Sequence, residues 1–254
     1  MTSALSLDNL SVRVGEKSVC ETLTLNIEPG ERWAVLGING IGKTTLLHTL
    51  SGLRPPASGK VGAGGTALDA LEPRQRAQQI GLMSQDDEFA AETRVLDAVL
   101  LGRLPHLSWW RGESAEDIAC ARAALRRVGL DESFDERLAL TLSGGERRRV
   151  ALATLLAQAA PLLILDEPTT HLDLHHQIAL LDLLAGLGGH TLVMSLHDVN
   201  LATRFCTHAL LLFGDGQCCG GPLTTMLNGP VLSRLYRHEI RSHQTGDGTI
   251  YLPA

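Results

Sequence analysis

Nine residues near the start of the chain, GINGIGKTT, combine three glycines with a lysine and two threonines. They run from Gly37 to Thr45, directly after the apolar run Trp33 to Leu36 and into a helical pattern from Thr44 to Ser51. The spacing fits G-x-x-x-x-G-K-[ST] in the strand and helix context that this motif requires. Glycines allow a tight turn whose N–H groups point at phosphate oxygens, and the helix adds the positive end of its dipole. The stretch therefore predicts a nucleoside triphosphate site.

The side chains of this loop have separate expected tasks. Lys43 is expected to reach the β and γ phosphates, and the Thr44 hydroxyl is expected to ligate Mg²⁺. A glycine-rich turn with a chance lysine is disfavoured, because a strand and a helix flank the loop. The residues predicted to hold the nucleotide here are Gly37, Asn39, Gly40, Gly42, Lys43, Thr44 and Thr45.

A second candidate motif, PLLILDEP, runs from Pro161 to Pro168 and is an apolar strand followed by two acids. Open α/β sheets bind ligands at the carboxyl ends of their strands, so Asp166 and Glu167 are expected at such an edge. We predict that Asp166 supports Mg²⁺ and that Glu167 polarises the attacking water. For this dipeptide alone, an acidic turn that caps the next helix is the alternative.

A third stretch, LSGGERRRV from Leu142 to Val150, places Ser143 and two glycines at the start of a predicted helix. It suits an anion site made of backbone N–H groups and a hydroxyl, and it equally suits a simple serine cap. Because it lies between the other two motifs at a typical spacing, the chain resembles the ATP-binding cassette (ABC) family, whose signature is LSGGQ. The resemblance covers nearly the whole chain.

The resemblance extends to three further residues. Gln85 in LMSQ matches the family's Q-loop glutamine, which meets Mg²⁺ and the attacking water. Asp173 in TTHLDL matches the D-loop aspartate, and His197 in SLHDVN matches the switch histidine that contacts the γ-phosphate. The family pattern thus implies catalytic roles for Glu167, His197, Lys43 and Gln85, and Mg²⁺ contacts for Thr44, Gln85 and Asp166.

The family pattern also implies an assembly. Two copies would pack head to tail around two ATP molecules, so that the phosphate loop of one copy faces the signature of the other. Neither copy alone would complete a site, and hydrolysis would proceed by in-line attack of water on the γ-phosphorus. The signature residues expected at the opposite nucleotide are Ser143, Gly144, Gly145 and Glu146, with Asp173 nearby.

Two departures from the family pattern bear on nucleotide binding. Val14 stands where an aromatic side chain usually stacks on adenine, and such stacking is worth roughly 1–3 kcal/mol per base in nucleic-acid sites. We therefore expect weaker ATP binding, by about tenfold or more. Glu146 replaces the usual glutamine of the signature, which exchanges an amide for an acceptor-only carboxylate.

One segment indicates a transport class. LLGRLPHLSWWRGESAED, from Leu100 to Asp117, resembles the GR-x-P-x-L segment of ABC ATPases that energise uptake of iron chelates and vitamin B12. In those proteins the segment meets a membrane permease. Trp109 and Trp110 are therefore expected either at that contact or packed within the helical region, and the sequence leaves both open.

Short apolar runs alternate with helical patterns, which predicts an α/β fold with a mostly parallel sheet. The family resemblance implies a RecA-like P-loop NTPase core with an antiparallel β subdomain and an inserted α-helical subdomain. The whole chain, 1–254, is expected to be one ABC ATPase domain, with a core over 1–84 and 159–225, a helical subdomain over 85–158 and a tail over 226–254. The predicted strands are Leu5 to Val14, Ser18 to Ile27, Arg32 to Leu36, Ile80 to Ser84, Leu162 to Leu165, Thr191 to Ser195 and Ala209 to Phe213.

Composition limits the partners. The chain has 254 residues and a net charge of −6, with no polybasic tract, so nucleic acid is not an expected partner. The run Arg147 to Arg149 is interpreted as a solvated helix face. The pair His175 and His176 points to two faces of a helix, which disfavours a shared metal ion. No segment reaches the about 18 apolar residues of a membrane span, and the N-terminus has no secretion pattern.

The resulting hypothesis is an ATPase subunit at the cytoplasmic face of the inner membrane. It would energise import of cobalamin or an iron complex as a homodimer under permease subunits, supplied by an extracytoplasmic binding protein. The alternatives are a soluble ABC ATPase not tied to transport and the ATPase subunit of an exporter.

Overall fold

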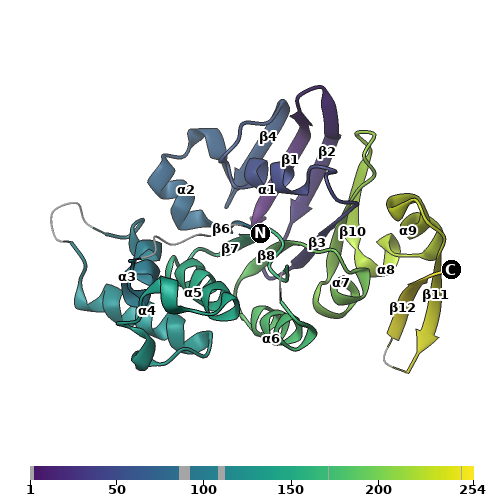
Figure 1. The fold of residues 1–254 in the computed structure, drawn as a ribbon. Coiled ribbons are helices and arrows are strands. Elements are labelled where there is room, and N and C mark those ends of the chain that lie inside the picture. The colour runs from purple at the N-terminus through teal and green to yellow at the C-terminus, as the bar shows by residue number, and fades with distance from the viewer. Residues whose placement is uncertain (1–2, 86–91, 108–111, 171, 247) are drawn as a thin grey trace.

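The computed structural model describes residues 3–85, 92–107, 112–170, 172–246 and 248–254. Two sheets and a group of helices form the body of the molecule, with a small hairpin at the C-terminal side (Figure 1). Within these ranges no helix is both long enough and apolar enough to cross a membrane.

The central sheet has six strands in the order β10-β9-β3-β8-β7-β6. Neighbours from β9 to β6 pair in parallel, and β10 pairs antiparallel with β9 at one edge. Parallel pairing brings the carboxyl ends of β3, β7 and β8 to one edge, where the candidate motifs follow the strands. The strands are β3 (Arg32–Leu36), β6 (Ile80–Met83), β7 (Leu162–Leu165), β8 (Thr191–Ser195), β9 (His208–Leu212) and β10 (Cys218–Pro222).

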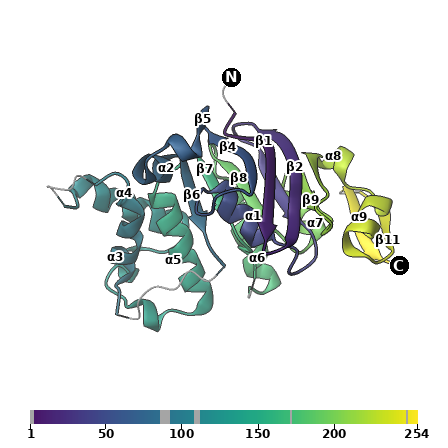
Figure 2. The same cartoon turned by 90° about the horizontal axis from the view of Figure 1, so that it is seen from above.

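A second, antiparallel sheet lies over helix α1 (Lys43–Leu50), as Figures 1 and 2 show. Its strand order is β2-β1-β4-β5. The long pair β1 and β2 forms a hairpin whose apolar side chains alternate with exposed polar ones, as expected for a sheet with one buried face. The strands are β1 (Leu5–Val14), β2 (Lys17–Ile27), β4 (Ser58–Ala63) and β5 (Thr66–Ala67).

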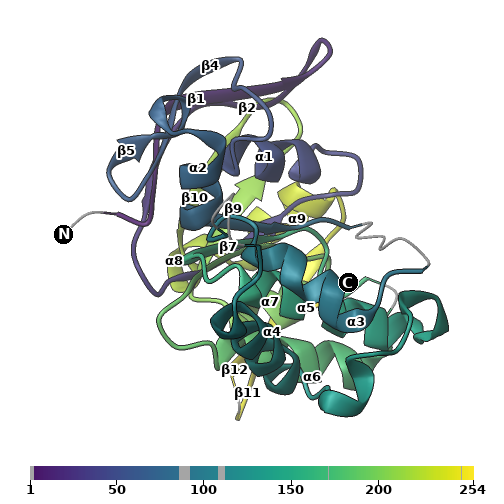
Figure 3. The same ribbon diagram turned by 90° about the vertical axis from the view of Figure 1, so that its left-hand side faces the viewer.

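Helices α3, α4 and α5 pack on one another (Figure 3), at the side of the core beyond β6 (Figure 1). Helix α4 begins at a capping box in which Ser114 and Asp117 satisfy each other's backbone N–H groups. The helices are α2 (Pro73–Gln79), α3 (Val95–Leu100), α4 (Ala115–Arg127), α5 (Gly144–Ala157), α6 (Leu174–Ala185), α7 (Val199–Phe205), α8 (Leu223–Met226) and α9 (Gly229–Tyr236). Short 3-10 turns occupy Leu68–Ala70, Leu101–Arg103, Glu132–Phe134 and Ala139–Thr141.

Strand β3 divides the apolar interior into two clusters. Trp33 and Val35 pack toward α1 and the antiparallel sheet, whereas Ala34 and Leu36 pack toward the helices on the other face. Successive side chains of a strand point to opposite faces, so one five-residue strand serves both clusters. The strand is therefore fixed from both sides, and so is the loop that begins directly after it.

Each predicted strand exists within one residue at either end. The sequence missed β4, β5 and β10, whose residues SGKVGA, TA and CCGGP lack apolar alternation. It also missed the C-terminal hairpin of β11 (Ile240–Thr245) and β12 (Gly248–Pro253). That hairpin is docked on α7, because the Asn200 side chain bonds both backbone groups of Tyr251 at 2.8 and 3.1 Å.

Candidate active site

The glycines of the phosphate loop lie where a side chain would clash or would strain the backbone. A Cβ atom on Gly42 would approach the Val19 side chain of β2 to 2.5 Å, and one on Gly37 would approach the Leu212 carbonyl of β9 to 2.8 Å. Gly40 meets nothing but has a φ of 69°, in the left-handed region that favours glycine. Gly37 and Gly42 thus allow neighbouring strands to approach the loop closely, and Gly40 allows the turn.

Helix α1 begins directly after Gly42 and has no side-chain cap. Its first N–H groups are therefore directed out of the helix without a side-chain partner, as an anion site requires. Asn39, Gly40 and Thr44 are exposed at this end, and Thr45 is half-buried.

The Lys43 side chain is buried and folds back onto its own loop. Its ammonium group donates to the Gly37 carbonyl at 3.0 Å and to the Ile38 carbonyl at 3.4 Å. Burial lowers the pKa of Lys43, while the nearby carboxylates of Glu167 and Asp166 act to raise it. The structure thus brings the phosphate-loop lysine and both acids of the second motif to the same edge of the sheet.

Asp166 is fully buried at the end of β7. Its Oδ1 accepts a hydrogen bond of 2.6 Å from the Ser195 hydroxyl, at the end of the neighbouring strand β8. Its Oδ2 is buried and has no hydrogen-bond partner among the described residues. Buried carboxylate oxygens are normally satisfied, so this atom is a candidate ligand for a cation or for the water around one.

Glu167 lies between two hydrogen-bond donors. His197 Nε2 is 2.9 Å from its Oε1, and the Thr170 hydroxyl donates to its Oε2 at 3.0 Å. A carboxylate oxygen has more than one lone pair, so each oxygen keeps an acceptor position for a water molecule. The Glu167 side chain is 16% exposed and that of His197 39%, which leaves the pair open on one side.

The surroundings of Glu167 favour its charged form. Burial alone would raise the pKa of the carboxyl, but hydrogen bonds from His197 and Thr170, helped by the charge of Lys43, outweigh it and hold the pKa below its usual value. Glu167 is therefore ionised at neutral pH and can accept a proton or orient a water molecule.

Glu167 also has an unusual backbone. Its φ is 48°, in the left-handed region that non-glycine residues seldom adopt. The Ser195 hydroxyl accepts a hydrogen bond from its N–H at 2.7 Å while donating to Asp166. One serine thus orders both acids, and nothing in the sequence pattern had indicated Ser195.

Among the described contacts, no hydrogen bond or ion pair joins the signature residues Ser143 to Glu146 to this group. Ser143 caps α5 in a reciprocal box with Glu146: the Glu146 carboxylate accepts from the Ser143 N–H at 2.7 Å, and the Ser143 hydroxyl accepts from the Glu146 N–H at 3.3 Å. Hydrogen bonds from the backbone and hydroxyl of Ser143, with Arg137 beside it, lower the pKa of Glu146. Ser143 and Gly144 are exposed and Gly145 is half-buried at the start of the helix.

The two remaining predicted residues are Asp173 and Gln85. Asp173 caps α6, where its carboxylate accepts from the N–H of His176 at 2.9 Å and lies 2.8 Å from that residue's Nδ1. Gln85 follows β6 and is exposed, and among the described contacts no hydrogen bond joins its side chain to Glu167 or Lys43. The structure thus brings Lys43, Asp166, Glu167 and His197 together, and it leaves Gln85, Asp173 and the signature outside that group.

The arginine run after the signature is not simply a solvated face. Arg147 is exposed, but the Arg148 guanidinium is half-buried and donates to backbone carbonyls after β6 and β7. The interpretation of the run as solvated was therefore wrong for Arg148. These carbonyls are main-chain groups, which leave no pattern in a sequence.

Two residues of the β1–β2 hairpin bear on the predicted nucleotide site. Lys17 donates to the Gly40 carbonyl at 2.9 Å and so ties the hairpin to the phosphate loop, which the sequence did not indicate. Val14 is 42% exposed at the end of β1.

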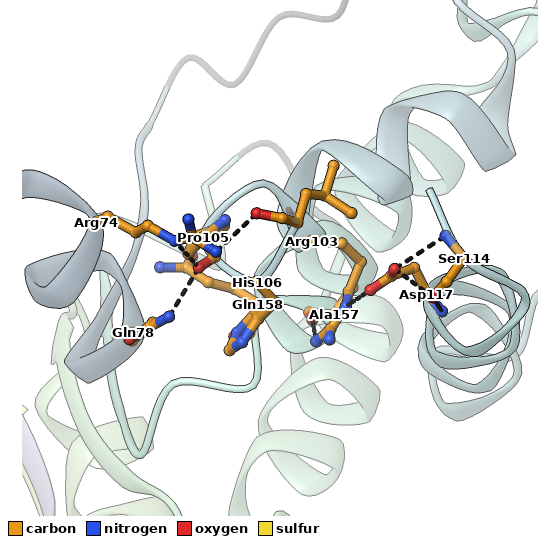
Figure 4. A network of polar contacts seen from close by, with 10 residues as sticks. Arg74, Gln78, Arg103, Pro105, His106, Ser114, Asp117, Ala157 and Gln158 are labelled. Atoms are coloured by element: carbon orange, nitrogen blue, oxygen red, sulfur yellow. Dashed lines mark hydrogen bonds and ion pairs between the residues drawn. The ribbon is translucent and has the colours of Figure 1, made fainter. Parts of the chain in front are cut away.

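The GR-x-P segment is held by polar contacts from three helices (Figure 4). Arg103 pairs with Asp117 at 3.0 Å and donates to the Ala157 carbonyl at 2.8 Å. Arg74 and Gln78 of α2 both donate to the Pro105 carbonyl, each at 2.8 Å. Trp109 and Trp110 lie outside the described residues.

The geometry, a phosphate loop facing two carboxylates and a histidine at one sheet edge, is that of a P-loop nucleoside triphosphatase. The family model described as ABC transporter matches residues 20–170. The ferric enterobactin transport ATP-binding protein FepC of Escherichia coli (strain K12) is 37% identical over 236 residues, covering 90% of this chain and 85% of that protein. The hemin import ATP-binding protein HmuV of Myxococcus xanthus (strain DK1622) is 39% identical over 244 residues, covering 92% and 90%. The chain belongs to the ABC transporter family.

Solved structures agree. A metal-chelate-type ABC transporter in an inward-facing conformation superposes with a TM-score of 0.86 at 29% identity, covering 99% of this chain and 98% of that one. The dimeric post-hydrolysis state of the ATP-binding cassette MJ0796, bound to ADP and Pi, gives a TM-score of 0.73 at 30% identity, covering 86% and 98%. The predicted fold class is therefore confirmed, and so is the predicted activity: the protein is an ATPase of this family.

Proposed function

We propose that this protein binds and hydrolyses ATP to energise import of an iron complex (siderophore or haem) or of cobalamin through a membrane permease. The observation that carries the catalytic part is the Glu167 carboxylate, held by His197 and Thr170 beside Lys43 and Asp166. The substrate class is supported by relatives whose names describe transport of ferric enterobactin, hemin import and cobalamin import.

In this proposal Glu167 orients and activates the attacking water. Its ionised carboxylate has a free acceptor position on each oxygen. His197, whose Nε2 lies 2.9 Å from Oε1, fixes the orientation of the carboxylate. Lys43 and the uncapped start of α1 hold the phosphates and stabilise the charge that develops on them. His197 also contacts the γ-phosphate, which ties the position of Glu167 to the bound nucleotide.

The residues present fit Mg²⁺. The unpartnered, buried Oδ2 of Asp166 and the exposed hydroxyl of Thr44 are hard oxygen donors, which this ion prefers. Thr44 and Asp166 would hold it, directly or through its water, together with the side chain of Gln85. The ion would supply Lewis-acid stabilisation of the phosphate oxygens.

The signature requires a second copy in this proposal. Ser143, Gly144 and Gly145 would face the nucleotide on the phosphate loop of the partner, with Asp173 at the same contact. The dimeric cassette among the similar structures supports this arrangement. The two copies would lie under permease subunits at the cytoplasmic face of the membrane, supplied by an extracytoplasmic binding protein.

The division of the chain is part of the proposal. Residues 85–158 form the helical subdomain, residues 1–84 and 159–225 form the core, and the tail begins near 226. The GR-x-P segment at Arg103 to Pro105, clamped by α2 and the end of α5, would present a fixed surface to the permease.

One experiment tests the transport assignment. The protein would be tagged at its C-terminus in its own host, the membranes extracted gently, and the co-purifying chains identified by mass spectrometry. A polytopic permease is expected, and ATP turnover of that complex should rise with one substrate and its binding protein. Recovery only with soluble chains, such as ribosomal or DNA-associated proteins, would contradict the transport assignment while leaving the ATPase untouched.

A further inference from the structure

The guanidinium of Arg148 lies at the meeting point of helix α5 and the central sheet. It donates to five backbone carbonyl oxygens, through all three of its nitrogens. These carbonyls belong to Ser84 at 3.2 Å, Gln85 at 3.3 Å, Asp166 at 3.3 Å, Glu167 at 2.9 Å and Pro168 at 3.2 Å.

These carbonyls belong to the ends of two neighbouring strands. Ser84 and Gln85 follow β6, and Asp166 to Pro168 follow β7. The strands pair in parallel up to Met83 and Leu165, and the ladder continues with a bond of 2.9 Å from the Asp166 N–H to the Met83 carbonyl. Arg148 therefore joins the two strands beyond the point where their pairing stops, and it holds the ends of β6 and β7 at a fixed separation.

The chemistry of this position requires arginine. A guanidinium is planar and carries five N–H donors in a rigid fork, whereas a lysine ammonium is a compact charge with three. Only the planar guanidinium can donate at once to the carbonyls at both strand ends. The same side chain extends from α5, five residues after the Ser143 cap, so it also ties the start of the signature helix to both strand ends.

The bond to Glu167 has a particular consequence. Glu167 adopts a φ of 48°, a backbone conformation that is unfavourable for a residue with a Cβ and persists only where its surroundings enforce it. Ser195 accepts from its N–H at 2.7 Å, and Arg148 donates to its carbonyl at 2.9 Å. Both polar groups of the Glu167 backbone are therefore held, one from β8 and the other from α5.

We infer that Arg148 is a positioning residue for ATP hydrolysis. It enforces the backbone conformation that directs the Glu167 carboxylate toward His197, and it makes that conformation depend on where α5 lies. Movement of the helical subdomain relative to the core would then change the position of Glu167 directly. The inference rests on the proposed role of Glu167 in activating water.

Three single variants test it. Arg148→Gln removes the fork, and Arg148→Lys keeps the charge and the stem but cannot reach both strand ends. Arg147→Gln is the matched control, because Arg147 is exposed on the same helix and is adjacent in sequence. Thermal unfolding and ATP binding are measured for each variant, and steady-state kinetics give kcat and KM for ATP separately.

For Arg148→Gln we expect kcat to fall by about 10- to 100-fold, the size of effect that follows from small misplacement of a reacting group. The KM for ATP should change by less than about threefold, because the phosphate loop is intact. Arg148→Lys should stay below a third of the parent kcat, and Arg147→Gln should match the parent. The inference would be overturned if Arg148→Lys had the parent kcat. It would also be overturned if, in Arg148→Gln, the KM for ATP rose by the same factor as kcat fell. If the glutamine variant does not fold, the lysine variant decides.

A double variant separates positioning from general loss of structure. In an Arg148→Gln, Glu167→Gln protein, the residual turnover should equal that of Glu167→Gln alone, because Arg148 acts through Glu167. A further tenfold loss would mean an independent effect and would sink the inference. Normal turnover in Glu167→Gln alone would instead contradict the proposed function, and the two failures are therefore distinguishable.

Discussion

Two carboxylates in this protein have similar burial and opposite uses. Asp117 pairs with Arg103, and both side chains are 11% exposed, whereas Glu167 pairs with His197, at 16% and 39% exposed. The Asp117 carboxylate accepts three hydrogen bonds from Ser114 and Arg103, at 2.6, 3.0 and 3.1 Å. Glu167 has one donor on each oxygen.

The difference shows what separates a structural ion pair from the pair that we propose to be catalytic. Arg103 is permanently charged and also binds the Ala157 carbonyl, so its pair joins α4, α5 and the GR-x-P segment. His197 is partly exposed, lies at the open edge of the sheet and leaves Glu167 with acceptor capacity. The first arrangement maximises satisfied bonds, and the second keeps room for a reactant.

The largest expected effect is on turnover. Glu167→Gln should lower kcat by about 10²- to 10⁴-fold, because an amide cannot accept a proton from water, while ATP binding is kept. Steady-state kinetics and ATP titration measure both, and size-exclusion chromatography with ATP should show a trapped dimer. Asp117→Asn is the control and should leave the kcat of the folded protein within about twofold. Similar losses in both variants would erase the contrast between the two carboxylates.

A large effect on stability is expected at the other pair. Arg103→Ala leaves Asp117 without its cation in a site that is mostly buried, and should lower the free energy of unfolding by about 3 kcal/mol. Arg94→Ala is the matched control, since the Arg94–Glu136 pair is 56% and 74% exposed and should contribute less than about 1 kcal/mol. Urea unfolding of the three proteins measures this, and equal losses would contradict the prediction.

The Asp117 pair should also have an acid signature. Hydrogen bonds from the hydroxyl and N–H of Ser114, and then from Arg103, lower the pKa of Asp117 from 3.8 to about 2. A pKa that is lower in the folded state stabilises the fold above the unfolded pKa, and that contribution is lost as the pH falls through the folded value. The stability advantage over Asp117→Asn should therefore be complete above pH 3.8 and shrink toward pH 2. Urea unfolding at pH 6 and below pH 4 checks this, and an advantage independent of pH would contradict it.

The smallest expected effect concerns the second donor to Glu167. Thr170→Val removes the hydroxyl at 3.0 Å while keeping the shape, and should lower kcat by about fivefold with little change in KM. Thr203→Val is the control, because among the described residues the Thr203 hydroxyl bonds a carbonyl of its own helix α7 and no other group. If Thr170→Val matched the parent, His197 alone would position the carboxylate.

Much of the fold could be predicted because buried strands are apolar and alternate with helical patterns. The strand at Leu162–Leu165 is an example, since four consecutive apolar residues followed by Asp166 and Glu167 leave little ambiguity. The edge strand Cys218–Pro222 was missed because it contributes backbone pairing with few apolar side chains, which gives no periodic pattern.

The sequence by itself determined the phosphate-loop motif at Gly37 to Thr45, the two acids after β7, the start of a helix at Ser143 and the family, since each depends on residue type at a local spacing. Only the tertiary structure decided that Ser195 orders both acids and that Thr170 and His197 share the carboxylate of Glu167. It alone placed Arg148 on five carbonyls and Lys17 on the phosphate loop. Contacts to the main chain join distant segments through groups that every residue carries, so no residue pattern records them.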